Sequence, residues 1–157
     1  MIKINIVAVG KVKEKYFIDA IEEYKKRLQK FCQLKIIEVK EENFCNEPNS
    51  LERLEIMKRE GLSISKELKG YVIAMAIEGK KFSSEEFSKN LDKIKNTNSE
   101  ITFVIGGSYG IDKSIKDTAN FKMSFSDMTF PHTLARVMLV EQLYRAFTIS
   151  VDGKYHK

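Results

Sequence analysis

Hydrophobic residues along this chain alternate between short, continuously apolar runs and longer segments in which they recur every three or four positions. The short runs are typical of buried strands, and the longer segments of amphipathic helices. The apolar runs predict strands at 2–9, 34–39, 71–77, 101–105 and 121–125. Strands that alternate with helices indicate an α/β domain with a largely parallel sheet and helices on both faces.

The segments between the strands predict helices with one apolar face. The first of these helices is marked by apolar residues at helical spacing: Phe17, Ile21, Tyr24, Leu28 and Phe31. A polar loop at 41–49 precedes the second helix, and Ser50 is its expected N-cap. Gly79 is expected to end the third strand. Pro131 stands at the expected start of a final helix that runs to about Phe147.

The final helix differs from the others because its apolar residues surround its whole circumference. These residues are Leu134, Val137, Met138, Leu139, Val140, Leu143, Tyr144, Ala146 and Phe147. A helix of this kind is buried on all sides, which favours a two-fold dimer over a central helix within a monomer. Glu141 and Arg145 lie four positions apart and predict either an ion pair or, for Arg145, a phosphate contact. Arg136 points to the opposite side and is a second candidate phosphate contact.

Composition narrows the class of protein. A chain of 157 residues, 43% hydrophobic and 31% charged, predicts one soluble globular domain over 1–157. The net charge of +5 fits either a solvated, lysine-rich surface or a polyanionic partner such as nucleic acid. Cys32 and Cys45 lack metal-site spacing, and two free thiols fit a reducing cytoplasm. The apolar run at 4–9 is too short to span a membrane.

Two loops near the end of the chain carry the features of a ligand site. The strand at 101–105 runs into Gly106 and Gly107, and the segment 124–132 leads into the last helix. Glycine-bearing loops at the carboxyl ends of strands are where open α/β sheets hold ligands. The loop after the first strand lacks the G-x-G-x-x-G spacing of a nucleotide-binding Rossmann domain. By itself this pattern predicts a dimeric α/β ligand-binding protein, and the glycine pair also fits a tight strand-to-helix turn.

A set of motifs along the whole chain resembles a known family. The motifs are INIVAVGK at 4–11, AIEGK at 76–80, FVIGGSYG at 103–110, SFSDMTFPH at 124–132, EQLYRAF at 141–147 and YHK at 155–157. They resemble the SPOUT class of methyltransferases, and most closely the ribosomal RNA large-subunit methyltransferase H family. The resemblance implies a C-terminal trefoil knot, a homodimer and S-adenosylmethionine as the cofactor. It assigns cofactor contacts to Met75, Gly106, Phe125, Ser126, Asp127, Met128, Thr129 and Phe130.

The resemblance also implies a reaction. The acceptor would be the N3 atom of a pseudouridine in helix 69 of 23S ribosomal RNA, within the assembled 70S ribosome, without a metal or a membrane. That nitrogen must lose a proton, which calls for a base or an oxyanion stabiliser. The candidate catalytic residues are His132, Arg145, Tyr155 and His156, of which the last two would reach the partner protomer's cofactor. His132 could instead make a structural hydrogen bond at the helix start. The alternative function for the whole protein is non-enzymatic binding of RNA or the ribosome.

Overall fold

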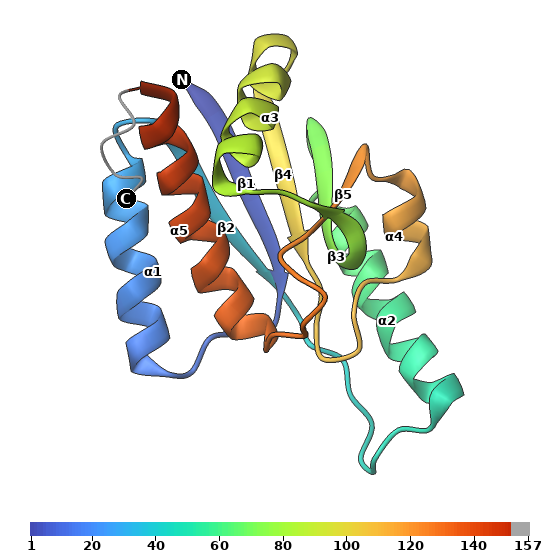
Figure 1. Cartoon of the computed structure of the whole chain (residues 1–157). Coiled ribbons are helices and arrows are strands. Elements are labelled where there is room, and N and C mark those ends of the chain that lie inside the picture. The colour runs from blue at the N-terminus through green and yellow to red at the C-terminus, as the bar shows by residue number, and fades with distance from the viewer. Residues whose placement is uncertain (152–157) are drawn as a thin grey trace.

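The computed structural model describes residues 1–151, and in this part of the chain five strands form one sheet (Figure 1). The strand order is β2-β1-β4-β3-β5, and every neighbouring pair is parallel. The strands are β1 (Ile2–Val9), β2 (Cys32–Val39), β3 (Tyr71–Lys81), β4 (Glu100–Ile105) and β5 (Phe121–Ser124). The predicted α/β class with a mostly parallel sheet is confirmed.

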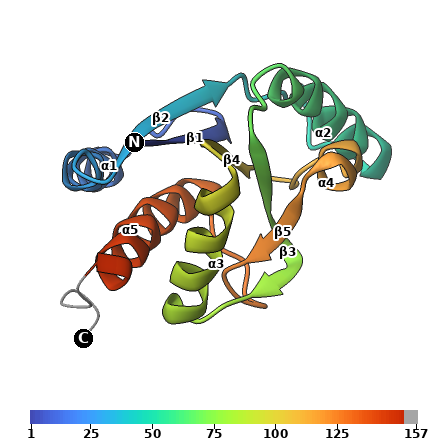
Figure 2. The ribbon, with the colours of Figure 1, turned by 90° about the horizontal axis from the view of Figure 1, so that it is seen from above.

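Helices cover both faces of the sheet (Figure 2). One face carries α1 (Lys15–Leu28), α3 (Ser84–Thr97) and α5 (His132–Val151), and the other carries α2 (Ser50–Ser65) and α4 (Lys113–Thr118). The alternation of side chains along β1 supplies both cores. Ile4, Ile6 and Ala8 pack on the side of α5, whereas Val7 and Val9 pack on the side of α2.

The start of α2 differs from the prediction by one residue. Asn49, and not Ser50, is the N-cap: its side chain accepts a hydrogen bond from the Glu52 amide at 2.9 Å. The Glu52 carboxylate in turn accepts from the Asn49 amide at 3.1 Å. Moving the cap one position upstream places a glutamate at the third helical position and completes a capping box, which Ser50 followed by Arg53 could not form.

Gly79 does not end β3, which continues to Lys81. Instead, the pairing of β3 with β5 shifts register between Met75 and Lys80. A Cβ atom on Gly79 would lie 2.6 Å from backbone atoms of Lys122 and Met123. The glycine is therefore required where two backbones approach closely. Beyond Ala74, β3 no longer pairs with β4 and continues beside β5 alone.

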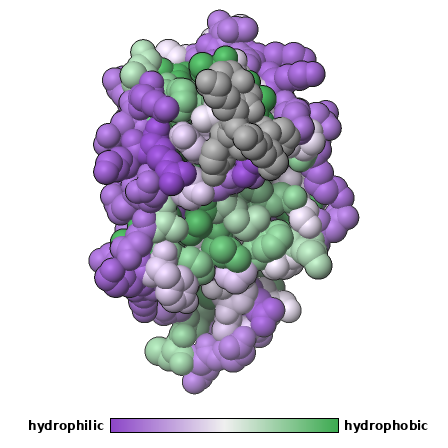
Figure 3. Space-filling model, turned by 60° about the vertical axis from the view of Figure 1, so that its left-hand side comes forward, coloured by the Kyte–Doolittle hydropathy of each residue, from purple (hydrophilic) through white to green (hydrophobic). Residues whose placement is uncertain are grey.

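The last helix, α5, lies against α1 and α3 and runs to Val151, beyond the predicted end near Phe147. One side of α5 is buried in the core by Leu139, Val140 and Leu143. Its other side carries apolar residues that stay half-exposed, namely Leu134, Val137, Met138 and Tyr144. Figure 3, in which the left-hand side of Figure 1 is turned forward, shows apolar surface gathered across the middle of this face of the molecule. The predicted dimer remains a prediction.

Arg136 is not available to contact phosphate, so that prediction is wrong. Its side chain is 2% exposed and lies inside the protein. The guanidinium pairs with the Glu38 carboxylate at 2.6 Å and donates to the Gly10 carbonyl at 3.1 Å. Helical spacing placed Arg136 on a different side of α5 from Arg145, but that side turned out to face the ends of β1 and β2.

Candidate functional site

A cavity of about 810 Å³ opens at the carboxyl ends of β3, β4 and β5. This volume lies within the range of small-molecule and cofactor pockets. Three segments that are far apart in the sequence line most of it: 75–78 in the second half of β3, 105–111 after β4, and 123–135 from the end of β5 into α5. The two loops that the sequence singled out therefore meet in one site, and the end of β3 joins them.

The first wall of the cavity is the glycine loop, defined here as residues 106–110. The loop is a tight turn in which the Gly110 amide donates to the Gly107 carbonyl at 3.1 Å. Gly110 has a φ of +98°, a conformation that side-chain-bearing residues rarely adopt. A Cβ atom on Gly106 would lie 2.7 Å from the carbonyl carbon of Gly110. The loop therefore needs glycine at both positions to close its turn, and Gly106, Gly107 and Gly110 line the cavity with backbone alone.

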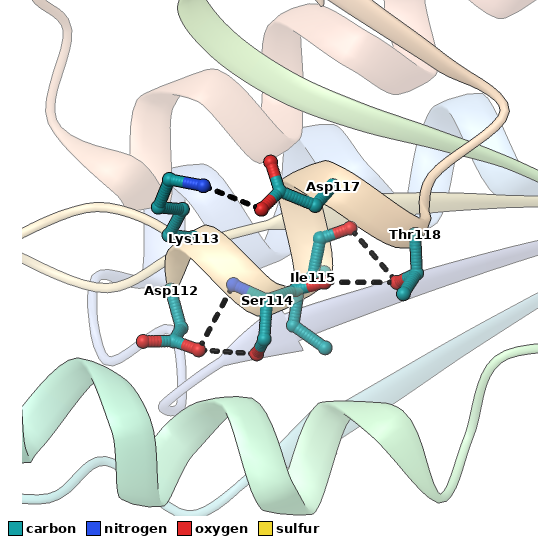
Figure 4. A network of polar contacts seen from close by, with 6 residues as sticks. All are labelled: Asp112, Lys113, Ser114, Ile115, Asp117 and Thr118. Atoms are coloured by element: carbon teal, nitrogen blue, oxygen red, sulfur yellow. Dashed lines mark hydrogen bonds and ion pairs between the residues drawn. The ribbon is translucent and has the colours of Figure 1, made fainter.

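Helix α4 holds the downstream end of the glycine loop (Figure 4). Asp112 caps this short helix, accepting from the Ser114 amide at 3.2 Å and from the Ser114 hydroxyl. Lys113 pairs with Asp117 at 2.6 Å, and the Thr118 hydroxyl donates to the backbone carbonyls of Ser114 and Ile115. These local contacts stabilise a helix of only six residues and so keep the loop's exit in one place.

The second wall is the segment between β5 and α5. The Ser124 hydroxyl accepts from the Ser126 amide at 3.2 Å, and the Ser126 hydroxyl accepts from the Met128 amide at 3.0 Å. These serine turns bend the segment around the cavity. The predicted cofactor residues that line the cavity are Met75, Gly106, Phe125, Ser126, Met128, Thr129 and Phe130. The eighth, Asp127, is exposed and forms an ion pair with Lys81 at 2.7 Å.

His132 also lines the cavity, at the first residue of α5. Its Nδ1 atom is buried and has no hydrogen-bond partner among the residues that the structure describes. A buried polar atom without a partner calls for an explanation, and a bound ligand is one. The alternative role for His132, a structural hydrogen bond at the helix start, finds no support at this nitrogen.

Arg145 lies elsewhere. It is 13 positions along α5 from His132, or about 20 Å at 1.5 Å per residue, and it does not line the cavity. Its guanidinium pairs with Glu141 through contacts of 2.8 and 3.1 Å, which confirms the predicted ion pair. Tyr155 and His156 lie outside the described residues. The catalytic roles assigned to these three residues stay predictions.

The structure adds cavity residues that sequence reasoning did not name. Tyr109 lines the cavity from the glycine loop, and the Arg53 guanidinium of α2 lies 5.1 Å from its ring centroid. Glu78 and Lys116 line it as well and pair at 2.8 Å. The hydrogen bond from Lys116 holds the pKa of Glu78 below its ordinary value. The motif that contains Glu78 was visible in the sequence, but its ion-pair partner on α4 was not.

Within residues 1–151, no cluster of three or more histidine, cysteine, aspartate or glutamate side chains is arranged to hold a metal ion. None of the helices there has the length and apolar character needed to cross a membrane.

Comparison with solved structures supports the fold. A probable methylase family protein from Haemophilus influenzae superposes with a TM-score of 0.54 at 12% identity, covering 98% of this chain and 70% of that one. A Legionella pneumophila putative methyltransferase, described as in complex with the bound cofactor SAM, superposes with a TM-score of 0.50 at 11% identity. That match covers 93% of this chain and 66% of the Legionella chain. At these identities the likeness concerns the fold alone.

Comparison of sequences is more specific. A family model described as "Predicted SPOUT methyltransferase" matches residues 2–156. Proteins named ribosomal RNA large subunit methyltransferase H from Clostridium acetobutylicum and Leuconostoc mesenteroides are 50% and 48% identical, over 98% of this chain and 99% of each relative. A Methanococcus vannielii protein with the same name, marked as putative, is 46% identical over the same shares. The chain therefore belongs to the SPOUT methyltransferases, and within them to the ribosomal RNA large subunit methyltransferase H family.

Proposed function

We propose that this protein transfers a methyl group from S-adenosylmethionine to the N3 atom of a pseudouridine in helix 69 of 23S ribosomal RNA. It acts as a homodimer on the assembled 70S ribosome, in the cytoplasm. The observation that carries the proposal is the cavity at the ends of β3, β4 and β5, where seven of the eight expected cofactor residues converge. The names of the full-length relatives support the ribosomal RNA substrate.

The residues present fit S-adenosylmethionine. Apolar side chains of Phe125, Met128 and Phe130 offer surface for an adenine ring, and the bare backbone at Gly106 offers hydrogen-bonding groups for a ligand edge. The Legionella structure with SAM bound supports the same cofactor. When bound, the cofactor supplies a methyl group on a positively charged sulfonium, and this chemistry requires no metal.

The chain's own residues align the two reactants and manage the acceptor proton. The walls described above hold the ligand in one orientation. His132 lies where it can accept a proton or polarise the acceptor base. Tyr155 and His156 act from the C-terminal segment of the partner protomer, and Arg145 is a further candidate catalytic residue.

The homodimer is formed through the half-exposed side of α5, which carries Val137, Met138 and Tyr144. A groove of about 400 Å³ between the start of α3 and α5 lies beside this surface and shares Phe125 with the cofactor cavity. Burying this surface removes apolar area from water, which stabilises association. The trefoil knot belongs to the same proposal: the chain leaves the edge strand β5 and returns as α5 to contact α1 and α3.

The decisive experiment is transfer of a labelled methyl group from S-adenosylmethionine to unmethylated 70S ribosomes, with free 23S RNA in parallel. We expect label on the ribosomes, mapping to a pseudouridine of helix 69. Absence of label from both substrates, with cofactor binding intact, would contradict the proposed acceptor. Binding to ribosomes should also weaken steeply with added salt, because lysine and arginine contacts to phosphate release counterions.

A further inference from the structure

Behind the glycine loop, α2 presents a carboxyl group that the proposed reaction does not use. Glu60 is 3% exposed. Its Oε2 atom accepts a hydrogen bond from the Glu42 amide at 3.1 Å, in the loop after β2. Its Oε1 atom is buried and has no hydrogen-bond partner in the described part of the chain. A buried carboxylate oxygen without a partner is costly, so this side chain needs an explanation.

Helix α2 touches the glycine loop and its exit at three points. A Cβ atom on Gly107 would lie 3.1 Å from Oε1 and 3.3 Å from Oε2 of Glu60. A Cβ atom on Gly61 would lie 3.0 Å from Cβ of Asp112, the cap of α4. The third contact is between Arg53 and the Tyr109 ring. The contact between Glu60 and Gly107 is the central one of the three. It places the carboxyl group of Glu60 directly against the glycine loop, on the side away from the cavity.

The charges that face Glu60 are negative. Glu41 and Glu42 face it from the loop after β2, and Asp112 lies beside the neighbouring Gly61. From β1 the nearest group at Gly107 is the apolar side chain of Val9. On α2 itself the adjacent cation, Arg59, pairs with Glu55 at 3.0 Å.

The pKa of Glu60 follows from these surroundings. Burial raises it to about 7, the hydrogen bond from the Glu42 amide opposes the rise, and the charges of Glu41 and Glu42 add to it. Since Oε2 accepts the Glu42 amide proton, the carboxyl proton of the neutral form resides on Oε1, which faces Gly107.

We infer that Glu60 is a positioning residue for the cofactor cavity: its neutral carboxyl group braces Gly107 from behind, and its ionisation loosens the glycine loop and weakens cofactor binding. The inference rests on the cofactor site proposed above. An ionised Glu60 has no cation beside it within the described residues, so it must recruit water. The glycine loop is the thin layer that separates it from the cavity, and displacement of that loop admits the water.

The first test is the affinity for S-adenosylmethionine, measured by calorimetry between about pH 6 and about pH 8.5, a range that brackets the expected ionisation. The affinity of the wild type for S-adenosylmethionine should fall by roughly fivefold or more as Glu60 ionises. Glu60→Gln keeps the shape and a donor of the neutral acid and should bind with little pH dependence, near the low-pH affinity of the wild type. Glu23→Gln, on the exposed side of α1, removes a carboxylate that does not face Glu60 and should follow the wild-type profile. Titration of the cofactor's own groups is common to all three proteins and cancels.

A second measurement needs no cofactor. Amide hydrogen exchange of residues 106–110 is compared between the wild type and Glu60→Gln at matched pH. We expect equal protection at low pH and faster exchange in the wild type at a pH where Glu60 is ionised, with Glu23→Gln unchanged from the wild type.

The outcomes separate the inference from the proposed function. The inference would be overturned if residues 106–110 exchanged at the same rate in the wild type and in Glu60→Gln at every pH. It would also be overturned if the affinity for S-adenosylmethionine changed with pH to the same extent in both proteins. If neither protein binds S-adenosylmethionine but their exchange rates still differ, Glu60 does stabilise the glycine loop, and the proposed cofactor is wrong. Should Glu60→Gln fail to fold, the wild type alone decides, because its loop exchange and its affinity must then change at one common pH.

Discussion

The guanidinium of Arg136 on α5 lies 2.6 Å from the carboxylate of Glu38 at the end of β2, although the two residues are 98 positions apart. Arg136 also donates to the carbonyl of Gly10, just past the end of β1. This one buried side chain therefore joins the first turns of α5 to two strand ends. Because α5 begins at His132, the contact also sets where the cavity-lining end of the helix lies.

Removal of Glu38 should destabilise the protein far more than a surface ion pair would. In Glu38→Ala the buried Arg136 loses its counter-charge, and we expect a loss of about 3 kcal/mol in the free energy of unfolding. Glu23→Ala removes the partner of Arg27 in a solvent-exposed pair of 3.0 Å and should cost less than about 1 kcal/mol. Urea titration of the two variants gives both numbers. Equal, small losses would contradict a structural role for the Arg136 pair.

A methyl group at Gly106 should impair cofactor binding. Its Cβ would lie 2.7 Å from the Gly110 carbonyl carbon, so Gly106→Ala must reshape the glycine loop. We expect the affinity for S-adenosylmethionine to fall by about tenfold or more, measured by calorimetry. Ser65→Ala, at the exposed end of α2 and outside the cavity lining, is the control. Full affinity in Gly106→Ala would show that this loop is not a cofactor wall.

Replacement of His132 should act on turnover more than on binding. In His132→Ala we expect kcat to fall by about tenfold to a hundredfold, the usual range for a lost proton-transfer group. The dissociation constant of the cofactor should change by less than about threefold. Thr133→Ala, the next residue of α5 and not part of the cavity lining, is the control. A variant with normal kcat and weakened cofactor binding would assign His132 to the cofactor and not to the proton.

Deletion of residues 155–157 should abolish methyl transfer and leave the affinity for S-adenosylmethionine nearly unchanged. The reason is that the proposed cofactor contacts lie in β3 and in the loops after β4 and β5, whereas Tyr155 and His156 are proposed to act on the acceptor base. Transfer to 70S ribosomes and calorimetry on the same truncated protein measure the two effects. Methylation at the normal rate would remove the tail from the mechanism.

The two cysteines should differ sharply in reactivity. Cys45 is exposed, whereas Cys32 is buried and its pKa is raised by that burial to about 11. Since the thiolate is the reactive form, a thiol reagent at about pH 8 should label Cys45 quickly and Cys32 only after unfolding. Mass spectrometry of labelled Cys45→Ser tests this: rapid labelling of the folded variant would mean that Cys32 is accessible.

Local chemistry was sufficient for much of the fold. The apolar alternation of residues 2–9 and the helical spacing of Phe17, Ile21 and Tyr24 depend only on neighbours along the chain, and both elements are present. Where two neighbouring residues could both cap a helix, the predicted start was wrong by one residue. Asn49 and Ser50 are both good N-caps, and the choice between them was made by Glu52, three residues beyond Asn49.

Gly79 and Arg136 show why other features could not be predicted from neighbours. In isolation, a glycine in an apolar run reads as the end of a strand, yet Gly79 is required by the backbone of β5 more than 40 residues later. Likewise, an arginine on a helix is normally predicted to be a surface charge, but Arg136 is buried because it pairs with Glu38 of β2. Both outcomes depend on pairs that only the folded chain brings together.

Periodicity and glycine placement are local properties, so they were enough to predict the strands, the helices and two of the segments that could hold a ligand. That these segments meet depends on the order of the strands in the sheet. The strand order β2-β1-β4-β3-β5 places β3 between β4 and β5, so Met75 of β3 and the loops bearing Gly106 and Phe125 line one cavity. The tertiary structure likewise placed Glu60 against Gly107. Such contacts arise from the packing of elements distant in sequence, a balance of burial and hydrogen bonding that no short stretch of residues contains.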